Sequence, residues 1–211
     1  MSNADTAYAA IRGKLLHGEY MAETLLSENV LAEELQMSRT PVRDAILRLV
    51  NEGFLVSLRN RGILVRRIPI KEIYDYMQVL NLFQKHAIEA AVEQGLSFPI
   101  EELRRYLEEE KQGAANKDYY RYVVHSLRFT RCFMSVAGNE AMIKVVDSYH
   151  DRMIFVSITN YNRTPHTPHY SSIPLHEDIL ASLEASDYER TKHLFDDFLR
   201  KSKYRMFELG Y

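Results

Sequence analysis

Four residues, Ser38, Arg39, Thr40 and Arg43, place hydroxyl and guanidinium groups within six consecutive positions of the chain. Such groups donate hydrogen bonds to phosphate oxygens and to the edges of bases, so the cluster favours contact with nucleic acid. The alternative interpretation is a surface helix with two solvated arginines. The residues that flank the cluster decide between these interpretations.

Positive charge is concentrated around this cluster. Residues 37–67 contain seven arginines, Arg48 and Arg61 among them, against two acidic residues, which gives a net charge of +5. The whole chain has a net charge of −2, so the remainder carries −7. A basic patch on an otherwise acidic chain suits contact with phosphates without general binding to polyanions.

The cluster lies at the start of a helix that is predicted to begin at Ser38 and to end near Asn51. Ser38 is a suitable N-cap, because its hydroxyl can accept a hydrogen bond from a first-turn amide. A shorter helix is predicted over residues 28–36, with its apolar residues, Val30 among them, facing inward. Two helices with so tight a turn between them indicate a helix-turn-helix. The second helix has apolar residues at helical spacing: Val42, Ala45, Ile46, Leu49 and Val50.

Two β-prone runs follow, at residues 54–58 and 63–68, and they predict a hairpin. Its tip, residues 59–62, contains Arg61 and Gly62. Glycine lets the backbone approach a partner closely, and the arginine can reach a phosphate or enter a minor groove. Directly after a helix-turn-helix, we interpret the hairpin as a DNA-contacting wing rather than as a solvated turn.

Residues 6–68 resemble the winged-helix domain of the GntR transcription regulators. The resemblance implies that Arg39 and Arg43 contact bases or phosphates, that Thr40 supports them, and that the hairpin tip enters the minor groove. Asn29 departs from the pattern, because some members carry a phosphate-contacting arginine there. The matching segments are Leu31-Ala32-Glu33-Glu34-Leu35, Ser38-Arg39-Thr40-Pro41-Val42-Arg43-Asp44-Ala45, Asn51-Glu52-Gly53-Phe54 and Arg61-Gly62.

Pro69 marks the expected boundary between two domains, residues 1–69 and 70–211, because proline interrupts the last β-prone run. Helical patterns dominate beyond it. The expected fold is mainly α, with a winged helix-turn-helix of three helices plus a β-hairpin, followed by an all-α antiparallel bundle. Helices are predicted near residues 6–17 in the first domain, and near 71–94, 99–113, 117–136, 139–160, 173–185 and 187–208 in the second.

The second half resembles the all-helical C-terminal domain of the FadR-type branch of the same family, through Gly138-Asn139 and His176-Glu177-Asp178-Ile179. Many such domains hold a divalent metal on one Asp and three His. By position, the resemblance puts Ser126, Thr130, His176 and Phe198 at those places. Zinc and nickel need about three or four protein donors, and only His176 is a strong one. We therefore expect this metal to be absent or weakly bound, and we expect no other cofactor.

A ligand pocket is still expected at this place, and without a metal the charge of a ligand needs another partner. The three polar residues among the four can supply hydrogen bonds, and Arg128 or Arg152 can supply charge. Phe198 makes the pocket less polar than a metal-bearing one. These features favour a carboxylate or an acyl compound as the small-molecule effector, rather than a small hydroxy acid.

Other polar residues have simpler interpretations. His166 and His169 lie in a loop over residues 160–172 and are expected to be solvated, and Glu108–Glu110 is interpreted as a solvated helix face. A metal-dependent hydrolase that uses these two histidines with His176 is an alternative, but the carboxylate or cysteine ligands it needs cannot be placed. The chain contains no nucleophile motif and no P-loop, so we do not expect an enzyme.

The leading hypothesis is a homodimeric, sequence-specific DNA-binding transcription regulator, a repressor by family habit. Its helical domain is expected to form the dimer and to bind the effector. The alternative is a constitutive regulator whose helical domain only dimerises. A single cysteine, the absence of a long apolar run and the absence of a secretory leader favour a cytoplasmic chain with no membrane partner.

Overall fold

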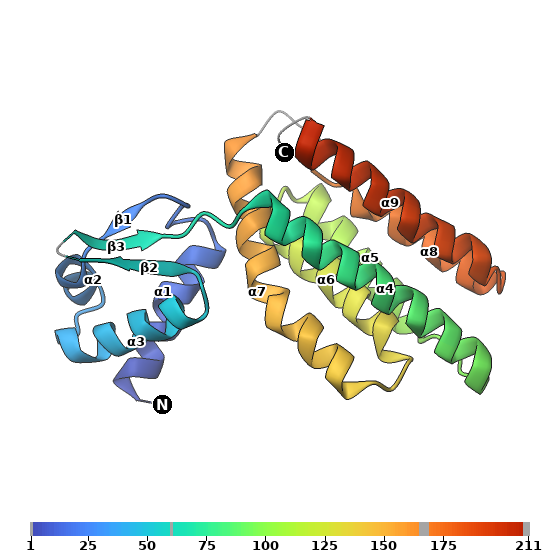
Figure 1. Ribbon diagram of the computed structural model, residues 1–211, viewed down its shortest axis with the longest axis horizontal. Helices are drawn as coiled ribbons and strands as arrows, with labels where there is room; N and C mark the ends of the chain where they lie inside the picture. Colours follow the sequence, from blue (N-terminus) through green and yellow to red (C-terminus); the bar gives the residue numbers. More distant parts are fainter. Residues whose placement is uncertain (1, 60, 165–168, 209–211) are drawn as a thin grey trace. The chain divides into compact units, whose positions relative to one another are not determined.

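Residues 2–59, 61–164 and 169–208 are described by a computed structural model, in which the chain divides into two units, Met1–Ile68 and Pro69–Tyr211 (Figure 1). In the structure the first unit ends at Ile68, whereas the sequence analysis placed the boundary one residue later, after residue 69. Each unit has its own buried apolar residues. None of the described helices combines the length and the apolar character that a membrane crossing requires.

The N-terminal unit contains the helix-turn-helix that the sequence predicts. Four residues, 35–38, separate α2 from α3, and both α1 and α2 pack against α3. Val30 does not face inward as expected: its side chain is 59% exposed, because the short α2 buries only the face that carries Leu31 and Ala32. The helices of this unit are α1 (Asn3–Leu16), α2 (Glu28–Glu34) and α3 (Arg39–Asn51).

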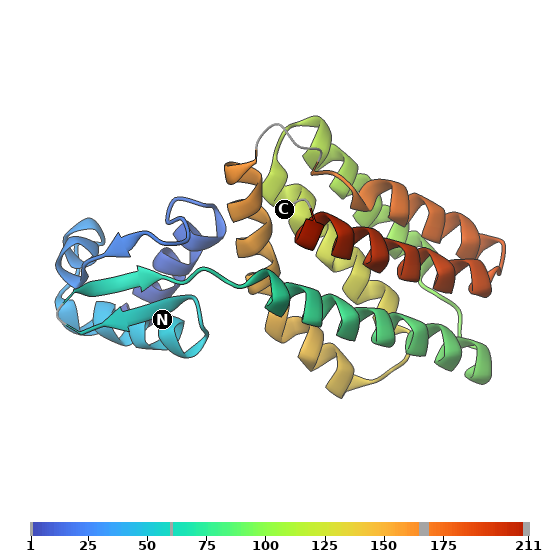
Figure 2. The ribbon, with the colours of Figure 1, turned by 45° about the horizontal axis from the view of Figure 1, so that its top comes forward.

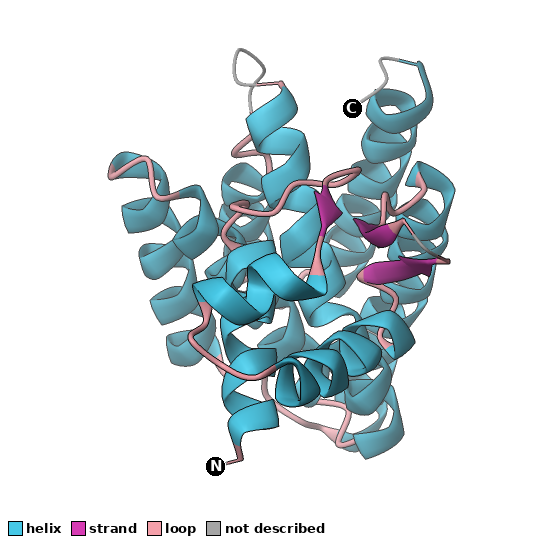
Figure 3. Ribbon diagram, turned by 90° about the vertical axis from the view of Figure 1, so that its left-hand side faces the viewer, coloured by secondary structure: helices cyan, strands magenta, loops and turns pink. Residues whose placement is uncertain are grey.

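A three-stranded antiparallel sheet, magenta in Figure 3, completes the unit. The predicted hairpin is present, with Ser57 opposite Ile63 across β2 and β3. The sequence did not predict β1, because two residues are too few to show alternation. β1 pairs with the other side of β3, so the strand order is β1-β3-β2. The strands are β1 (Leu25–Leu26), β2 (Leu55–Leu58) and β3 (Gly62–Val65).

The C-terminal unit is an all-helical bundle, as predicted, and each helix begins and ends within three residues of its expected bounds (Figure 2). Gly95 and Gly138 have positive φ and lie in two of the expected breaks. Asp118 and Asn139 accept hydrogen bonds from first-turn amides and so cap α6 and α7. The helices are α4 (Ile70–Gln94), α5 (Ile100–Ala115), α6 (Tyr119–Ser135), α7 (Glu140–Arg163), α8 (Ser172–Glu184) and α9 (Tyr188–Glu208).

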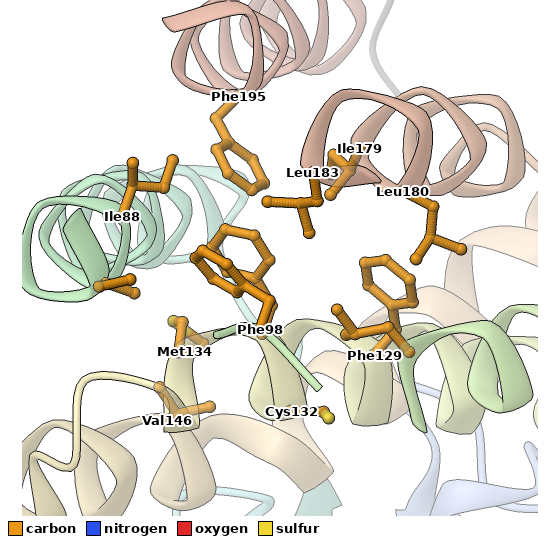
Figure 4. Close-up of a cluster of buried hydrophobic side chains, with 14 of the residues drawn as sticks. Ile88, Phe98, Phe129, Cys132, Met134, Val146, Ile179, Leu180, Leu183 and Phe195 are labelled. Atoms are coloured by element: carbon orange, nitrogen blue, oxygen red, sulfur yellow. The ribbon is translucent and has the colours of Figure 1, made fainter. Parts of the chain in front are cut away.

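The core of the bundle gathers apolar side chains from all of these helices. Figure 4 shows Phe98, from the α4–α5 connection, in the middle of side chains that come from α4, α6, α8 and α9. The Phe98 ring stacks on Phe133, with ring centroids 4.8 Å apart. Cys132 is buried among these residues and packs as a small apolar side chain. This core fixes the helices that surround the cavity described below.

Gly113 allows α5 and α6 to approach closely. A Cβ atom at this position would lie 2.6 Å from the backbone nitrogen of Tyr122, which no side-chain rotation can relieve. We expect Gly113→Ala to lower the free energy of unfolding by about 1–3 kcal/mol, as for other overpacked sites. Gly13→Ala is the matched control, because nothing lies within 4 Å of its Cβ position. Urea denaturation should show that this control is stabilised by about 0.5–1 kcal/mol, and equal effects of the two substitutions would contradict the close approach.

Candidate nucleic-acid interface and ligand cavity

The start of α3 and the tip of the β2–β3 hairpin lie at the same end of the N-terminal unit, on the left of Figures 1 and 2. The predicted contact residues at the start of α3, Ser38, Arg39, Thr40 and Arg43, are all exposed. Arg61 at the hairpin tip is also exposed, whereas Asn60 lies outside the described residues. The structure therefore brings together most of the residues that the sequence assigned to DNA contact.

Glu28 holds the two arginines of this surface. Its Oε2 accepts hydrogen bonds from Arg43 Nη2 at 3.0 Å and from Arg39 Nη2 at 3.5 Å. The hydrogen bond from Arg43 keeps the pKa of Glu28 below its usual value, and the same contact raises the pKa of Arg43. A carboxylate in the first turn of α2 thus orients the guanidinium groups of α3. The sequence analysis missed Glu28, because its contact crosses the turn between two helices.

Arg48 does not belong to this group. It follows Arg43 by five residues, which turns its side chain by about 140° around α3. Its Nη1 lies 2.9 Å from Asp5 Oδ1, and its guanidinium lies 3.9 Å from the centre of the Tyr8 ring, both on α1. From the sequence, Arg48 is expected to contact DNA as part of the basic patch of residues 37–67, and this contact stays a prediction. The geometry of Arg48 favours a role in joining α3 to α1.

Two expectations about local backbone can be compared with the structure. Ser38 is the N-cap of α3 with extended backbone, but its hydroxyl makes no capping hydrogen bond, so that part of the prediction is wrong. Gly62 has a φ of +98°, and a Cβ atom there would lie 2.7 Å from the carbonyl oxygen of Leu26. The backbone at Gly62 is therefore closely approached by Leu26 in β1 of the same chain.

A cavity of about 260 Å³ lies in the C-terminal unit between α4, α6, α7, α8 and α9. Four of the six predicted pocket residues line it: Ser126, Thr130, His176 and Phe198. Arg128 and Arg152 are not among the described lining residues, and Arg152 pairs instead with Glu72, at 3.3 Å. The charge that they were expected to supply comes from a residue that the sequence analysis missed, Arg205 of α9.

A buried hydrogen-bond network lies against one wall of this cavity. Glu110 is fully buried, contrary to the solvated face expected for it. Its Oε2 lies 2.7 Å from His176 Nδ1, and its Oε1 accepts a hydrogen bond from Ser172 Oγ at 2.5 Å. Tyr122 lies next in the network, with its hydroxyl 2.5 Å from Ser172 Oγ. The Phe129 ring stacks on His176, with centroids 3.9 Å apart, and fixes the plane of the imidazole.

His169 is not simply solvated, contrary to the expectation from the sequence. His169 is half-buried, its Nε2 lies 2.7 Å from the carbonyl oxygen of Thr164, and its ring contacts Tyr119 and Tyr161. His169 also lines the cavity. His166 lies outside the described residues.

Two sequence-family models match the chain. The model described as "Bacterial regulatory proteins, gntR family" matches residues 3–65, and the FCD domain model matches residues 72–201. The second match alone covers more than half of the chain. The chain belongs to the GntR family. Within that family it carries an FCD domain as its helical unit.

Relatives of this GntR protein are bacterial regulators. The Nta operon transcriptional regulator of Aminobacter aminovorans is 28% identical over 131 residues, which are 62% of this chain and 61% of that protein. The gluconate operon transcriptional repressor of Bacillus subtilis (strain 168) is 26% identical over 145 residues, 69% of this chain and 56% of that protein. The chain thus spans about three fifths of the length of these relatives.

The fold of the GntR chain is shared with a solved structure. A GntR transcriptional regulator from Rhodococcus sp. RHA1 aligns over 99% of both chains, with a TM-score of 0.81 and 16% identity. At this identity the likeness concerns the fold alone. It includes both the winged helix-turn-helix and the helical bundle.

The cavity of this GntR protein does not suit the metal that the family resemblance implies. Ser126, Thr130 and Phe198 supply two hydroxyls and an aromatic ring, and the Nδ1 atom of His176 is engaged by Glu110. Within the described ranges, no group of three or more His, Cys, Asp and Glu side chains is placed to hold a metal ion. Zinc and nickel need about three or four strong donors, so the residues present do not fit either metal.

Proposed function

We propose that this GntR-family chain is a sequence-specific DNA-binding transcription regulator that acts as a homodimer. The observation that carries the proposal is the exposed donor cluster Ser38–Arg43, at the same end of the unit as the hairpin tip. In this proposal, the start of α3 enters the major groove and Arg43 and Arg39 contact bases or phosphates. Arg61 and Gly62 of the wing contact the minor groove.

The homodimer rests on family membership and on the surface of the helical unit. Leu82, Val92 and Val145 are large apolar side chains exposed on α4 and α7. Such side chains can be covered when a second copy of the chain packs on the helical unit. Each subunit then reads one half-site, and the dimer sets the spacing between the two half-sites. We propose repression as the direction of control, in line with the relative that is named a repressor.

The helical unit is proposed to bind a small-molecule effector in the cavity lined by Ser126, Thr130, His176 and Phe198. The donor set described above supports binding without a divalent metal. An effector changes operator affinity only if it binds the DNA-bound and the free arrangement with different affinities. In this proposal the chain is therefore a regulator and not an enzyme.

Selection from a pool of random DNA duplexes, followed by affinity measurement at fixed salt, tests the DNA-binding function. We expect the full chain to enrich an inverted repeat and to bind it at least about 1,000-fold more tightly than random duplex. Light scattering on the complex should give two chains per duplex. Equal affinity for the enriched and the random duplexes would contradict sequence-specific regulation.

A further inference from the structure

The charge of the cavity lining indicates what kind of ligand it takes. Among the described residues that line the cavity, Arg205 is the one with a permanent charge, and none is Asp or Glu. A cavity with one guanidinium and no carboxylate attracts an anion, since the guanidinium binds carboxylate oxygens through two parallel hydrogen bonds. A cationic ligand would leave two positive charges together.

Arg205 lies near the polar wall of the cavity. Its guanidinium is 5.8 Å from the centre of the Phe198 ring, and its Nη2 donates to Ser202 Oγ at 3.3 Å. Burial raises the pKa of Tyr122 to about 12, and the nearby charge of Arg205 acts in the opposite direction. Among the side chains that the structure describes, Arg205 has no acidic partner. Its charge is therefore available to a ligand.

Hydrogen-bonding groups on the same wall come from the buried network. Tyr122, Ser172 and His176 all line the cavity, while Glu110 lies behind them. Because Nδ1 of His176 is held by Glu110, its Nε2 is the ring atom left for a ligand. The lining of this cavity therefore offers a guanidinium, whose charge acts on Tyr122, together with hydroxyls and an imidazole nitrogen.

The rest of the cavity is long, and most of the exposed area of its lining is apolar although polar side chains also contribute. Its lining on α9 runs from Phe195 to Met206, which is about 16 Å along the helix axis. Its volume of about 260 Å³ corresponds to roughly nine water molecules, or a ligand of about ten non-hydrogen atoms. The apolar lining residues are Met77, Leu80, Val123, Leu127, Met153, Leu175, Phe195, Phe198 and Met206.

We infer that the effector is a medium-length monocarboxylate with a mainly apolar chain, and that its carboxylate pairs with Arg205 beside Tyr122 and His176. The apolar chain lies along α9, against Phe198. This inference rests on the proposed effector function and names the chemical class that the cavity accepts. In this inference Arg205 and the buried network hold the carboxylate without a metal ion.

Calorimetric titration of the full chain with straight-chain carboxylates, from acetate to decanoate, tests this class. We expect octanoate to bind and to raise Tm, and the uncharged octanamide to bind at least tenfold more weakly. Because no metal is involved, EDTA should leave octanoate affinity unchanged. Equal binding of octanoate and octanamide, loss of octanoate binding in EDTA, or no binding by any acid of the series would overturn the inference.

Arg205→Gln should weaken octanoate binding at least tenfold, and Arg205→Lys should weaken it less because the charge is retained. Arg200→Gln is the matched control on the same helix, since Arg200 is exposed and pairs with Asp197 outside the cavity. Unchanged octanoate affinity in Arg205→Gln would refute the pairing. Operator binding by the ligand-free variants is measured separately, so a failure of the proposed DNA-binding function is distinguishable from a failure of this inference.

Discussion

Replacement of Arg43 by alanine is expected to weaken operator binding by a factor of roughly 5 to 150, the range for one good bidentate contact to a base. The guanidinium of Arg43 is exposed at the start of α3, and Glu28 holds it through hydrogen bonds from Nε and Nη2 at 3.3 and 3.0 Å. It is therefore pre-oriented, which lowers the entropy lost when it meets a base. Fluorescence anisotropy with labelled operator at fixed salt measures the effect.

Two further variants make the Arg43 result specific. Arg190→Ala removes the same charge from the helical unit, where Arg190 pairs with Asp178, and should leave operator affinity unchanged. Glu28→Gln removes the carboxylate that partly neutralises Arg39 and Arg43, so we expect tighter binding to random duplex. If Arg43→Ala binds the operator as tightly as the unmodified chain, Arg43 does not read DNA.

Glu110→Ala is expected to lower the free energy of unfolding of the helical unit by about 3–5 kcal/mol. The substitution removes a fully buried carboxylate and leaves His176 Nδ1 and Ser172 Oγ without their partner. Buried polar groups that lose their hydrogen bonds keep the cost of desolvation. Urea denaturation followed by circular dichroism measures the change.

Neighbouring Glu109 supplies the control for this prediction. Its carboxylate pairs with Arg121 at the surface, so Glu109→Ala should leave the unfolding free energy nearly unchanged. Glu110→Gln keeps an acceptor for Ser172 and should cost less than Glu110→Ala. A Glu110→Ala variant as stable as Glu109→Ala would show that the buried network does not stabilise the bundle.

The sequence predicted the helices and the hairpin because those elements follow from local spacing. Apolar positions in α3 recur at helical intervals, and the breaks around Gly95 and Gly138 carry residues that suit positive φ. The two-residue strand β1 has no such pattern. It exists because the side of β3 away from β2 needs a partner, which is a property of the folded unit.

The cavity was predicted in part. The four residues carried over by resemblance do line it. Arg128 and Arg152 were expected to supply its positive charge, but neither is among the described lining residues. The burial of Glu110 could have been predicted from the sequence, because Glu110 falls on the same helical stripe as Leu103 and Leu107, which are buried. The place of Arg205 in the cavity lining could not have been predicted in this way, since an arginine in the last turns of an amphipathic helix is ordinarily solvated.

The central claim is that the start of α3 and the hairpin tip form one DNA-binding surface. Backbone amide chemical-shift mapping of the full chain with operator DNA tests this claim most directly. The largest changes should fall at residues 38–43 and at Arg61 and Gly62, in the same titration. Changes confined to α1 or to the helical unit, with residues 38–43 and Gly62 unaffected, would contradict it.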